Sequence, residues 1–327
     1  MTKRPYVYIT RRLPEEILER FQKFADVGFW DSELEPVPRD VLLEEAKKAD
    51  GLFVMLSDRI DKELLNQAIN LKVVANLAVG YDNIDVEEAT KRGVAVCNTP
   101  DILTDTTADL TFSLILMTAR KLIKAADVVR KGEWSGWSPL YLAGSDVHHK
   151  TIGIVGMGKI GEAVAKRARG FDMKILYHNR NRKPEAEKNL GAIYCSFEKL
   201  VEESDFVVSL LPLTKETKGM FTNDVFKRMK KTAYFINAGR GAVVDEKALI
   251  EALKEGEIAG CGLDVFEREP IGADHPLLEM EQVVALPHIG SSSVETRMKM
   301  MVRCCENMEA ILTGKNPINL LNPQVLK

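Results

Sequence analysis

Short apolar runs rich in β-branched residues alternate with amphipathic stretches along most of the chain. The runs predict strands over residues 6–9, 51–55, 73–75, 94–98, 151–155, 174–177, 206–210, 233–237, 258–263 and 283–285. Helical periodicity fills most of the intervals between them. Alternation of this kind is typical of parallel sheets that are covered by helices. The pattern therefore predicts an α/β protein with doubly wound parallel sheets.

Two stretches predict unusually long helices. Residues 103–131 keep helical periodicity without an internal Gly or Pro, and Gly132 follows, so we expect one helix that carries the chain from one domain to another. Residues 293–313 follow a capping-box pattern at 292–295, and Gly314 ends the helix. An apolar stripe at alternating spacings of four and three indicates a packing surface in this second helix: Val294, Met298, Met301, Cys305, Met308 and Leu312.

The loop after the first long helix carries two of the three tryptophans, Trp134 and Trp137. Large aromatic residues in a loop usually contact something, and the sequence leaves three choices open: a subunit interface, a substrate pocket or local packing.

Length, charge and cysteine content exclude several classes of protein. A chain of 327 residues fits two domains. The net charge of -3, from 45 basic and 48 acidic residues, argues against a nucleic-acid partner or an anionic membrane surface. We expect no signal peptide and no membrane span. No Cys-x-x-Cys pair occurs, which favours a reducing cytoplasm; the five cysteines, each expected to be a buried thiol, are Cys97, Cys195, Cys261, Cys304 and Cys305.

The strongest local signal is Gly-x-Gly-x-x-Gly at 156–161, which follows a predicted buried strand and opens a predicted helix. Gly156 allows a tight turn, Gly158 lets the backbone approach a pyrophosphate, and Gly161 lets the helix pack closely on the strand. The pyrophosphate is then stabilised by the positive N-terminus of the helix. In this strand-turn-helix context, the motif predicts a dinucleotide site.

The end of the next strand indicates which dinucleotide binds. A site for NAD places a carboxylate there for the ribose 2′-hydroxyl, but no carboxylate occurs before Glu185. The segment instead carries three cations within four positions, which suit a 2′-phosphate. NADPH is therefore expected to be preferred over NADH; the residues concerned are Asn179, Arg180, Arg182 and Lys183.

Three later strands end in loops that carry Arg240, Glu269 and His288. Ligands of open parallel sheets bind beyond the carboxyl ends of the strands, so these loops can converge. Arg240 can hold a carboxylate, and His288 can donate a proton to a carbonyl oxygen while hydride reaches the carbon. Glu269 can orient His288 and favour its charged form. The combination predicts reduction of a 2-keto acid.

At this point the chain resembles the D-isomer-specific 2-hydroxyacid dehydrogenases, and most of all the glyoxylate/hydroxypyruvate reductases, over essentially its whole length. The resemblance rests on residues 76–85, 103–108 and 134–140 and on the three catalytic loops. It implies a Rossmann-type cofactor domain at 103–291, a flavodoxin-like substrate domain at 1–102 and 292–327, and an active site in the cleft between them. It also implies a homodimer.

The resemblance assigns roles residue by residue. Arg240, Glu269 and His288 match the catalytic set, and backbone N–H groups near Val79 and Gly80 would receive the substrate carboxylate. Trp137 matches a residue that reaches the active site of the neighbouring subunit. Asp264 would contact the nicotinamide amide. The other cofactor-binding residues expected are Gly156, Gly158, Lys159, Ile160, Gly161, Pro212, Ala238 and Gly290.

The sequence leaves alternative functions open. The same family contains 2-ketogluconate reductases and phosphoglycerate dehydrogenases; the latter often carry a regulatory domain, which we do not expect in a chain that ends at Lys327. A dinucleotide-sensing binding protein similar to the corepressors of this family is an alternative of a different class. We expect no metal site at His148 and His149, an exposed His275, and a small 2-keto or 2-hydroxy acid as substrate, whose side chain the sequence leaves open.

Overall fold

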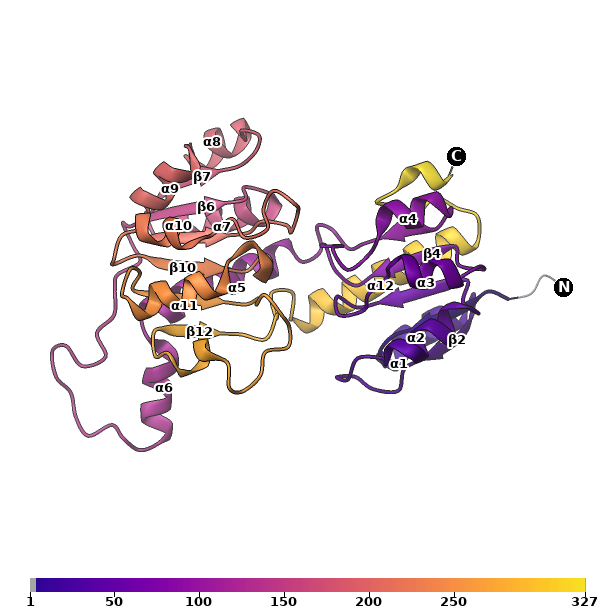
Figure 1. The fold of residues 1–327 in the computed structure, drawn as a ribbon, viewed down its shortest axis with the longest axis horizontal. Helices are drawn as coiled ribbons and strands as arrows, with labels where there is room; N and C mark the ends of the chain where they lie inside the picture. Colours follow the sequence, from indigo (N-terminus) through magenta and orange to yellow (C-terminus); the bar gives the residue numbers. More distant parts are fainter. Residues whose placement is uncertain (1–3, 327) are drawn as a thin grey trace. The chain divides into compact units, whose positions relative to one another are not determined.

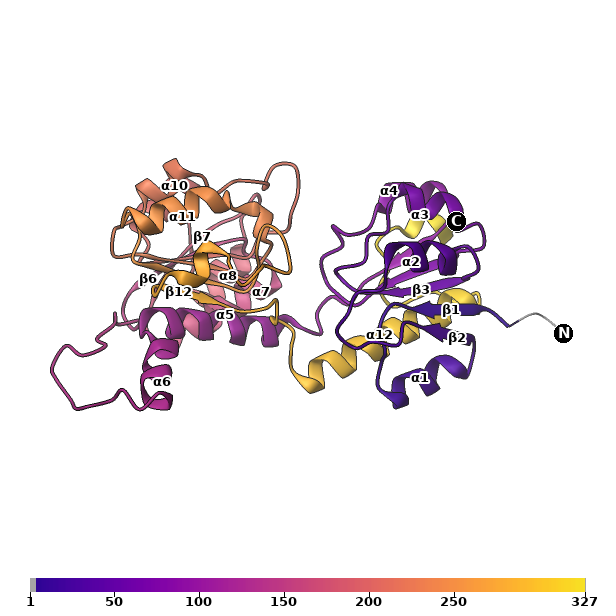
Figure 2. The ribbon, with the colours of Figure 1, turned by 60° about the horizontal axis from the view of Figure 1, so that its bottom comes forward.

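The computed structural model describes residues 4–326, which form two compact units. One unit comprises the described residues up to Leu103 and those from Ser293 onward, and the other comprises Thr104–Ser292. Each unit has a parallel sheet with helices on both faces (Figures 1 and 2), so the expected α/β class with two parallel sheets is confirmed. No helix within the described residues is long and apolar enough to cross a membrane.

The first unit is built on a five-stranded sheet of order β2-β1-β3-β4-β5. Helices α1 and α12 pack on one face, around Phe21 and Met308, and α2, α3 and α4 pack on the other, around Leu42 and Leu64 (Figure 2). The elements are β1 (Tyr6–Ile9), α1 (Glu15–Gln22), β2 (Asp26–Phe29), α2 (Arg39–Ala46), β3 (Gly51–Val54), α3 (Lys62–Gln67), β4 (Val73–Asn76), α4 (Val86–Lys91), β5 (Ala95–Cys97), α12 (Val294–Leu312) and η3 (Pro323–Leu326).

The second unit is built on a seven-stranded sheet of order β12-β11-β10-β9-β6-β7-β8, whose strand order reverses at β6. Such a reversal is where doubly wound sheets bind ligands. The elements are α5 (Thr104–Ala119), α6 (Leu122–Arg130), β6 (Thr151–Val155), α7 (Lys159–Arg169), β7 (Lys174–His178), α8 (Pro184–Leu190), β8 (Ile193–Tyr194), α9 (Phe197–Glu203), β9 (Phe206–Ser209), α10 (Asn223–Arg228), β10 (Tyr234–Asn237), η1 (Gly241–Val243), α11 (Glu246–Lys254), β11 (Gly260–Leu263), η2 (Pro276–Glu279) and β12 (Val283–Ala285).

The expected continuous helix at 103–131 is wrong, because the chain breaks it into α5 and α6. Lys121 has a left-handed φ of 52°. The carbonyl oxygen of Ala119 accepts a hydrogen bond of 2.9 Å from the backbone N–H of Ser145 instead of continuing the helical ladder. A Cβ on Gly144 would lie only 2.1 Å from that oxygen, so the later segment approaches closely enough to end the helix.

The last long helix is present, but its N-terminus differs from the capping box expected at 292–295. Ser293 is the N-cap residue, and its side chain accepts a hydrogen bond from the backbone N–H of Thr296. Glu295 therefore lies in the first turn, where its charge favours the helix dipole. Met301, Cys305 and Met308 of the expected stripe are buried, which confirms a packing surface along most of its length.

Candidate active site

The glycine motif forms the turn between β6 and α7. Gly156 has a φ of 101°, and a Cβ there would lie 2.9 Å from the carbonyl oxygen of Leu210. A Cβ on Gly161 would lie 2.4 Å from the carbonyl oxygen of Gly156, so helix and strand touch through this residue. Gly158 is the N-cap of α7, and an added Cβ would meet no atom within 4 Å. The turn thus leaves open space at a helix N-terminus, which fits a pyrophosphate; Lys159 and Ile160 are the first residues of the helix.

The segment after β7 carries the cations expected to select the cofactor. Arg180 is exposed, and Asn179 donates from its side chain to the carbonyl oxygen of Asn181. Arg182 is held elsewhere, because its guanidinium donates to both carboxylate oxygens of Glu187, at 3.1 and 2.6 Å, and lies over the Tyr194 ring. Lys183 precedes α8 and donates its backbone N–H to a tyrosine hydroxyl.

The positive charge of Arg180 acts on the loop that follows β9. The pKa of Glu216 in that loop is lowered, first by a hydrogen bond from Thr214 and also by the positive charges of Arg180 and Lys215. Pro212 lies at the start of the same loop, and its carbonyl oxygen accepts a hydrogen bond from the Thr217 hydroxyl. The two segments both follow strand ends at the carboxyl edge of the sheet, after β7 and after β9.

The loop after β10 presents Arg240 and is held by the buried Asn237. The Asn237 side chain donates to the carbonyl oxygen of Arg240 at 3.0 Å and accepts from the N–H of Gly239 at 3.1 Å. Ala238, in the same loop, donates its N–H to the carbonyl oxygen of Ser209 in β9. Asn237 is a residue that the sequence analysis missed, although a polar side chain that ends a buried strand is a usable signal.

Glu269 and His288 form a hydrogen-bonded pair, as the residue types suggested. His288 Nδ1 lies 2.6 Å from Glu269 Oε2, and both side chains are partly exposed. The other carboxylate oxygen, Oε1, accepts the backbone N–H of Phe266 at 2.9 Å. Since one ring nitrogen faces the carboxylate, Nε2 of His288 is the ring nitrogen left for another partner.

Asp264, at the end of β11, fixes the backbone around His288. Its carboxylate accepts the N–H groups of Ile289 and Gly290 at 2.7 and 2.8 Å, and its carbonyl oxygen accepts the N–H of His288 at 2.9 Å. His288 has a left-handed φ of 52°, which these three hydrogen bonds stabilise. Burial raises the pKa of the Asp264 carboxyl. From the sequence, only a cofactor contact is expected for Asp264.

In the first unit, the loop after β4 holds two adjacent N–H groups ready for an acceptor. The carbonyl oxygens of Val79 and Gly80 accept hydrogen bonds of 2.8 Å from the side chains of Asn98 and Asn76. Within residues 4–326, no protein acceptor takes the N–H of Val79 or Gly80. Fixed, unpaired N–H groups of this kind suit an anionic ligand.

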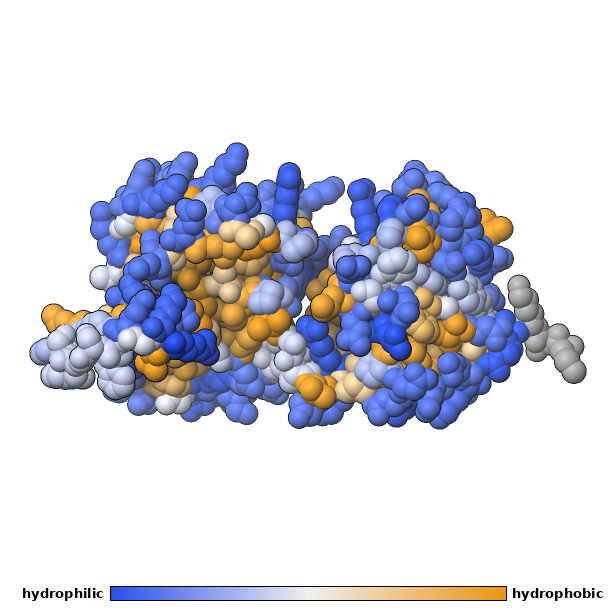
Figure 3. Space-filling model, turned by 90° about the horizontal axis from the view of Figure 1, so that it is seen from below, coloured by the Kyte–Doolittle hydropathy of each residue, from blue (hydrophilic) through white to orange (hydrophobic). Residues whose placement is uncertain are grey.

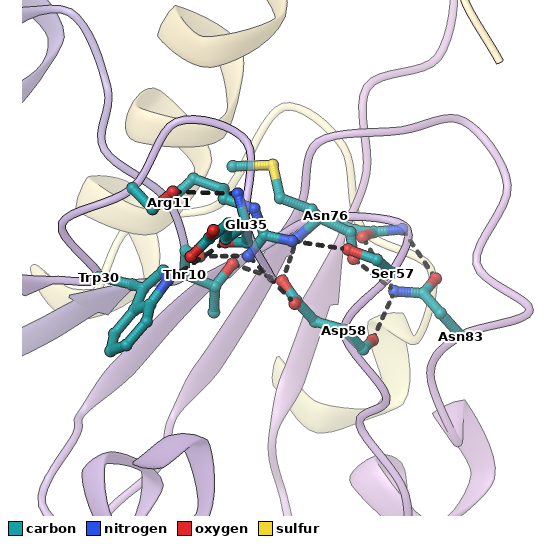
Figure 4. A network of polar contacts seen from close by, with 10 residues as sticks. Thr10, Arg11, Trp30, Glu35, Ser57, Asp58, Asn76 and Asn83 are labelled. Carbon is teal, nitrogen blue, oxygen red and sulfur yellow. Dashed lines mark hydrogen bonds and ion pairs between the residues drawn. The ribbon is translucent and has the colours of Figure 1, made fainter. Parts of the chain in front are cut away.

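A partly buried polar network joins the loop after β4 to the loops after β1 and β3 (Figure 4). Asn83 donates to the carbonyl oxygens of Met55 and Asp58, each at 3.1 Å, so it joins the loops after β3 and β4. Arg11 lies 3.6 Å from the Asp58 carboxylate and donates to the Ser57 hydroxyl at 2.9 Å. Burial raises the pKa of Asp58, against the opposing effect of its hydrogen bonds and of Arg11. The predictions from the sequence do not include this network.

The tryptophan loop makes few contacts within the chain. Trp137 is 83% exposed and Trp134 is 62% exposed. Local packing, one of the three choices, therefore does not account for these side chains. The exposed apolar residues of α6 and this loop, which we call the α6 face, are Leu122, Ile123, Val129, Trp134, Trp137, Leu140 and Tyr141. Apolar side chains gather on the side of Thr104–Ser292 that Figure 3 shows.

The remaining cysteines and histidines include one expectation that is confirmed, for the thiols, and one that is wrong, for His275. No cluster of metal-ligating residues occurs within the part of the chain that the structure describes. All five cysteines are free and buried, as expected. The expectation of an exposed His275 is wrong: its side chain is only 17% exposed, because it packs against the first turn of α11 and pairs there with Glu246.

Comparison with known proteins identifies the family. Residues 112–290 match the model of the D-isomer specific 2-hydroxyacid dehydrogenase NAD binding domain. The chain is 52% identical to a glyoxylate reductase of Thermococcus kodakarensis over 99% of this chain and 98% of the other. It is 50% identical to a glyoxylate reductase of Pyrococcus horikoshii, with the same coverage.

Comparison with solved structures leads to the same family. A protein of Thermus thermophilus is 40% identical with a TM-score of 0.90, over 97% of this chain and 99% of that one. The NADPH-dependent glyoxylate/hydroxypyruvate reductase of Sinorhizobium meliloti, in complex with NADP and malonate, is 32% identical with a TM-score of 0.86, over 98% of each chain. The chain therefore belongs to the D-isomer-specific 2-hydroxyacid dehydrogenases and is an NAD(P)-dependent enzyme.

Proposed function

We propose that this enzyme reduces small 2-keto acids, chiefly glyoxylate and hydroxypyruvate, to 2-hydroxy acids, and that it prefers NADPH over NADH. The observation that carries the reaction type is the contact of 2.6 Å between His288 Nδ1 and Glu269 Oε2 in the loops beyond β11 and β12. The choice of substrate is supported by the glyoxylate reductases that share about half of the sequence.

Each of these residues has a separate role in ketone reduction. Arg240 binds the substrate carboxylate through its planar guanidinium, and the N–H groups of Val79 and Gly80 add donors. His288 gives a proton from Nε2 to the carbonyl oxygen, and Glu269 keeps Nδ1 turned away from the substrate. Bound NADPH supplies the hydride. We assign substrate binding to residues 1–102 and 292–327 and cofactor binding to residues 103–291.

The cofactor is held, in this proposal, by the turn at Gly156–Gly161 and by the segment after β7. The open space at Gly158 supports the pyrophosphate position. Arg180 is the first candidate for the 2′-phosphate, together with Asn179 and Lys183, because Arg182 would have to leave its two hydrogen bonds to Glu187. Pro212, Ala238, Asp264 and Gly290 complete the proposed cofactor contacts.

We also propose a homodimer in the cytoplasm. The α6 face is apolar and exposed, which is typical of an interface, and Trp137 is the residue that would reach the partner subunit. Five free cysteines suit a reducing compartment. Light scattering on the purified chain would measure twice the mass of 36.6 kDa; the mass of a monomer would refute the dimer.

Steady-state kinetics test the activity and the cofactor preference together. Glyoxylate and hydroxypyruvate should give higher kcat/KM than pyruvate or 2-ketogluconate, with NADPH about 10- to 1000-fold better than NADH, as one or two charge-assisted hydrogen bonds would give. Arg180→Ala should lower kcat/KM with NADPH and leave kcat/KM with NADH unchanged. Arg182→Ala removes the same charge from the same segment and should lower kcat/KM with NADPH by less.

Two results would contradict this assignment. Equal or better kcat/KM with NADH would refute the phosphate site. Dinucleotide binding without turnover of any 2-keto acid would favour a sensing protein over an enzyme.

A further inference from the structure

A second histidine–carboxylate pair lies behind the loop that carries Glu269. His275 Nε2 is 3.0 Å from Oε1 of Glu246, which is in the first turn of α11. His275 Nδ1 accepts the backbone N–H of Leu277 at 3.4 Å. A ring nitrogen that accepts is unprotonated, so the proton of a neutral His275 is on Nε2 and points at Glu246. The side chains are 17% and 18% exposed, so the pair is largely shielded from water.

The second oxygen of the Glu246 carboxylate binds the backbone close to Glu269. Oε2 of Glu246 accepts the N–H of Glu267 at 3.1 Å. The preceding N–H, that of Phe266, donates to Glu269 Oε1 at 2.9 Å. Two successive N–H groups of one short segment are therefore bound by two carboxylates, one of which belongs to the partner of His288.

The same peptide also contacts the loop of Arg240. A Cβ on Gly241 would lie 1.8 Å from the carbonyl oxygen of Phe266 and 2.5 Å from the nitrogen of Glu267. The Phe266–Glu267 peptide is thus packed directly against the residue after Arg240. A shift of this peptide would change the position of Glu269 relative to His288 and would press on the Arg240 loop.

We infer that Glu246, oriented by His275, is a positioning residue for the Glu269–His288 pair: it fixes the N–H of Glu267, next to the N–H of Phe266 that binds the Glu269 carboxylate. This inference rests on the proposed roles of Glu269 and His288. Glu246 itself touches neither substrate nor cofactor in this assignment. Its effect on the rate comes from geometry, and small displacements of reacting groups are costly, since about 1 Å of misplacement can cost about 10²-fold.

Glu246→Gln tests the inference with little change in shape. A carboxylate accepts both the His275 ring proton and the Glu267 N–H, whereas the amide has one oxygen and loses one of the two bonds. We expect kcat to fall about 10-fold, within that limit, while the KM for NADPH changes less than about twofold. Glu251→Gln is the matched control: it is the same substitution on α11, at a side chain that accepts from Asn223, and it should leave both constants unchanged.

A double variant separates positioning from general loss of stability. If Glu246 acts through Glu269, then adding Glu246→Gln to a Glu269→Gln variant should hardly change kcat. Equal losses in both backgrounds, or a kcat like that of the wild type in the single variant, would overturn the inference.

A measurement that needs no turnover keeps this test independent of the proposed substrate. In protein labelled with ¹⁵N-histidine, the ring signal of His288, assigned by its absence in His288→Ala, should shift in Glu246→Gln and stay fixed in Glu251→Gln. An unchanged signal would overturn the positioning role. A wild type inactive on all 2-keto acids would refute the proposed function instead, and the ring signal would still decide this inference.

Discussion

Two alanine substitutions in the glycine motif should have different effects. Gly161→Ala should lower the stability of the protein, whereas Gly158→Ala should weaken cofactor binding. At Gly161, the added Cβ would lie 2.4 Å from a backbone oxygen, while ordinary contact begins at 3.4 Å, so backbone must move by about 1 Å. Overpacking costs about 1–3 kcal/mol, and backbone displacement favours the upper end. Alanine returns about 1 kcal/mol of helix propensity. The net loss of about 2 kcal/mol should lower Tm by about 4–8 °C.

Gly158→Ala should leave the free protein intact and weaken the cofactor. The residue has an extended backbone, with φ of -84° and ψ of -169°, and its Cβ would meet no atom within 4 Å. Alanine restricts the unfolded chain, which stabilises by up to about 1 kcal/mol, but it is a poorer N-cap than glycine by a similar amount. The two effects nearly cancel, so the stability of the free protein should change little. The methyl group would, however, occupy the space of the pyrophosphate. An overpacking cost of about 1–3 kcal/mol corresponds to about a 5- to 150-fold weaker affinity for NADPH.

Thermal unfolding without cofactor and fluorescence titration with NADPH give the two readouts separately. A Gly161→Ala variant that melts at the temperature of the wild type would contradict the predicted clash with the Gly156 carbonyl oxygen. A Gly158→Ala variant that binds NADPH as tightly as the wild type does would show that the pyrophosphate does not approach this residue.

Two further predictions concern the proton donor and the thiols. Glu269→Gln replaces a charge-assisted hydrogen bond worth about 1.5–3 kcal/mol, so kcat/KM for glyoxylate should fall about 10- to 150-fold, and His288→Ala should lose about 10²–10⁴-fold; a fully active Glu269→Gln would contradict the pairing. Burial raises the pKa of Cys97 and of Cys305 to about 12, so about 10⁻⁴ of each is thiolate at pH 8. A disulfide reagent should therefore titrate five thiols only after unfolding, and rapid reaction of the folded protein would show that these cysteines are accessible.

Local physics accounts for what the sequence determined by itself. Strands β1 and β6 begin and end as the apolar runs predict, because a buried parallel strand must be apolar on both faces. The turn at Gly156 needs a residue that tolerates positive φ, so its glycine is readable without a structure. Glu269 and His288 were identifiable because each follows a strand end, although 18 residues separate them along the chain.

The strands β2 and β8 and the helix break depended on contacts between distant residues. The strands β2 and β8 were not predicted, because β2 contains Asp and Gly and is half exposed and β8 has only two residues. Both lie at a sheet edge, and only pairing with β1 and β7 makes them strands. Lys121 ends a helix for which its neighbours in sequence predict continuation, since Ser145 takes the hydrogen bond that the helix needs.

Tertiary structure also decided which polar residues support the site. Arg180 and Arg182 look equivalent in sequence, but Glu187 and Tyr194 hold only the second of them in the described contacts. Glu246 reads as an ordinary acidic residue in a first helical turn. It becomes a candidate for positioning Glu269 only because folding brings His275 and the Glu267 N–H to its two oxygens. Periodicity and turn chemistry are local, whereas the satisfaction of a carboxylate depends on partners from elsewhere in the chain.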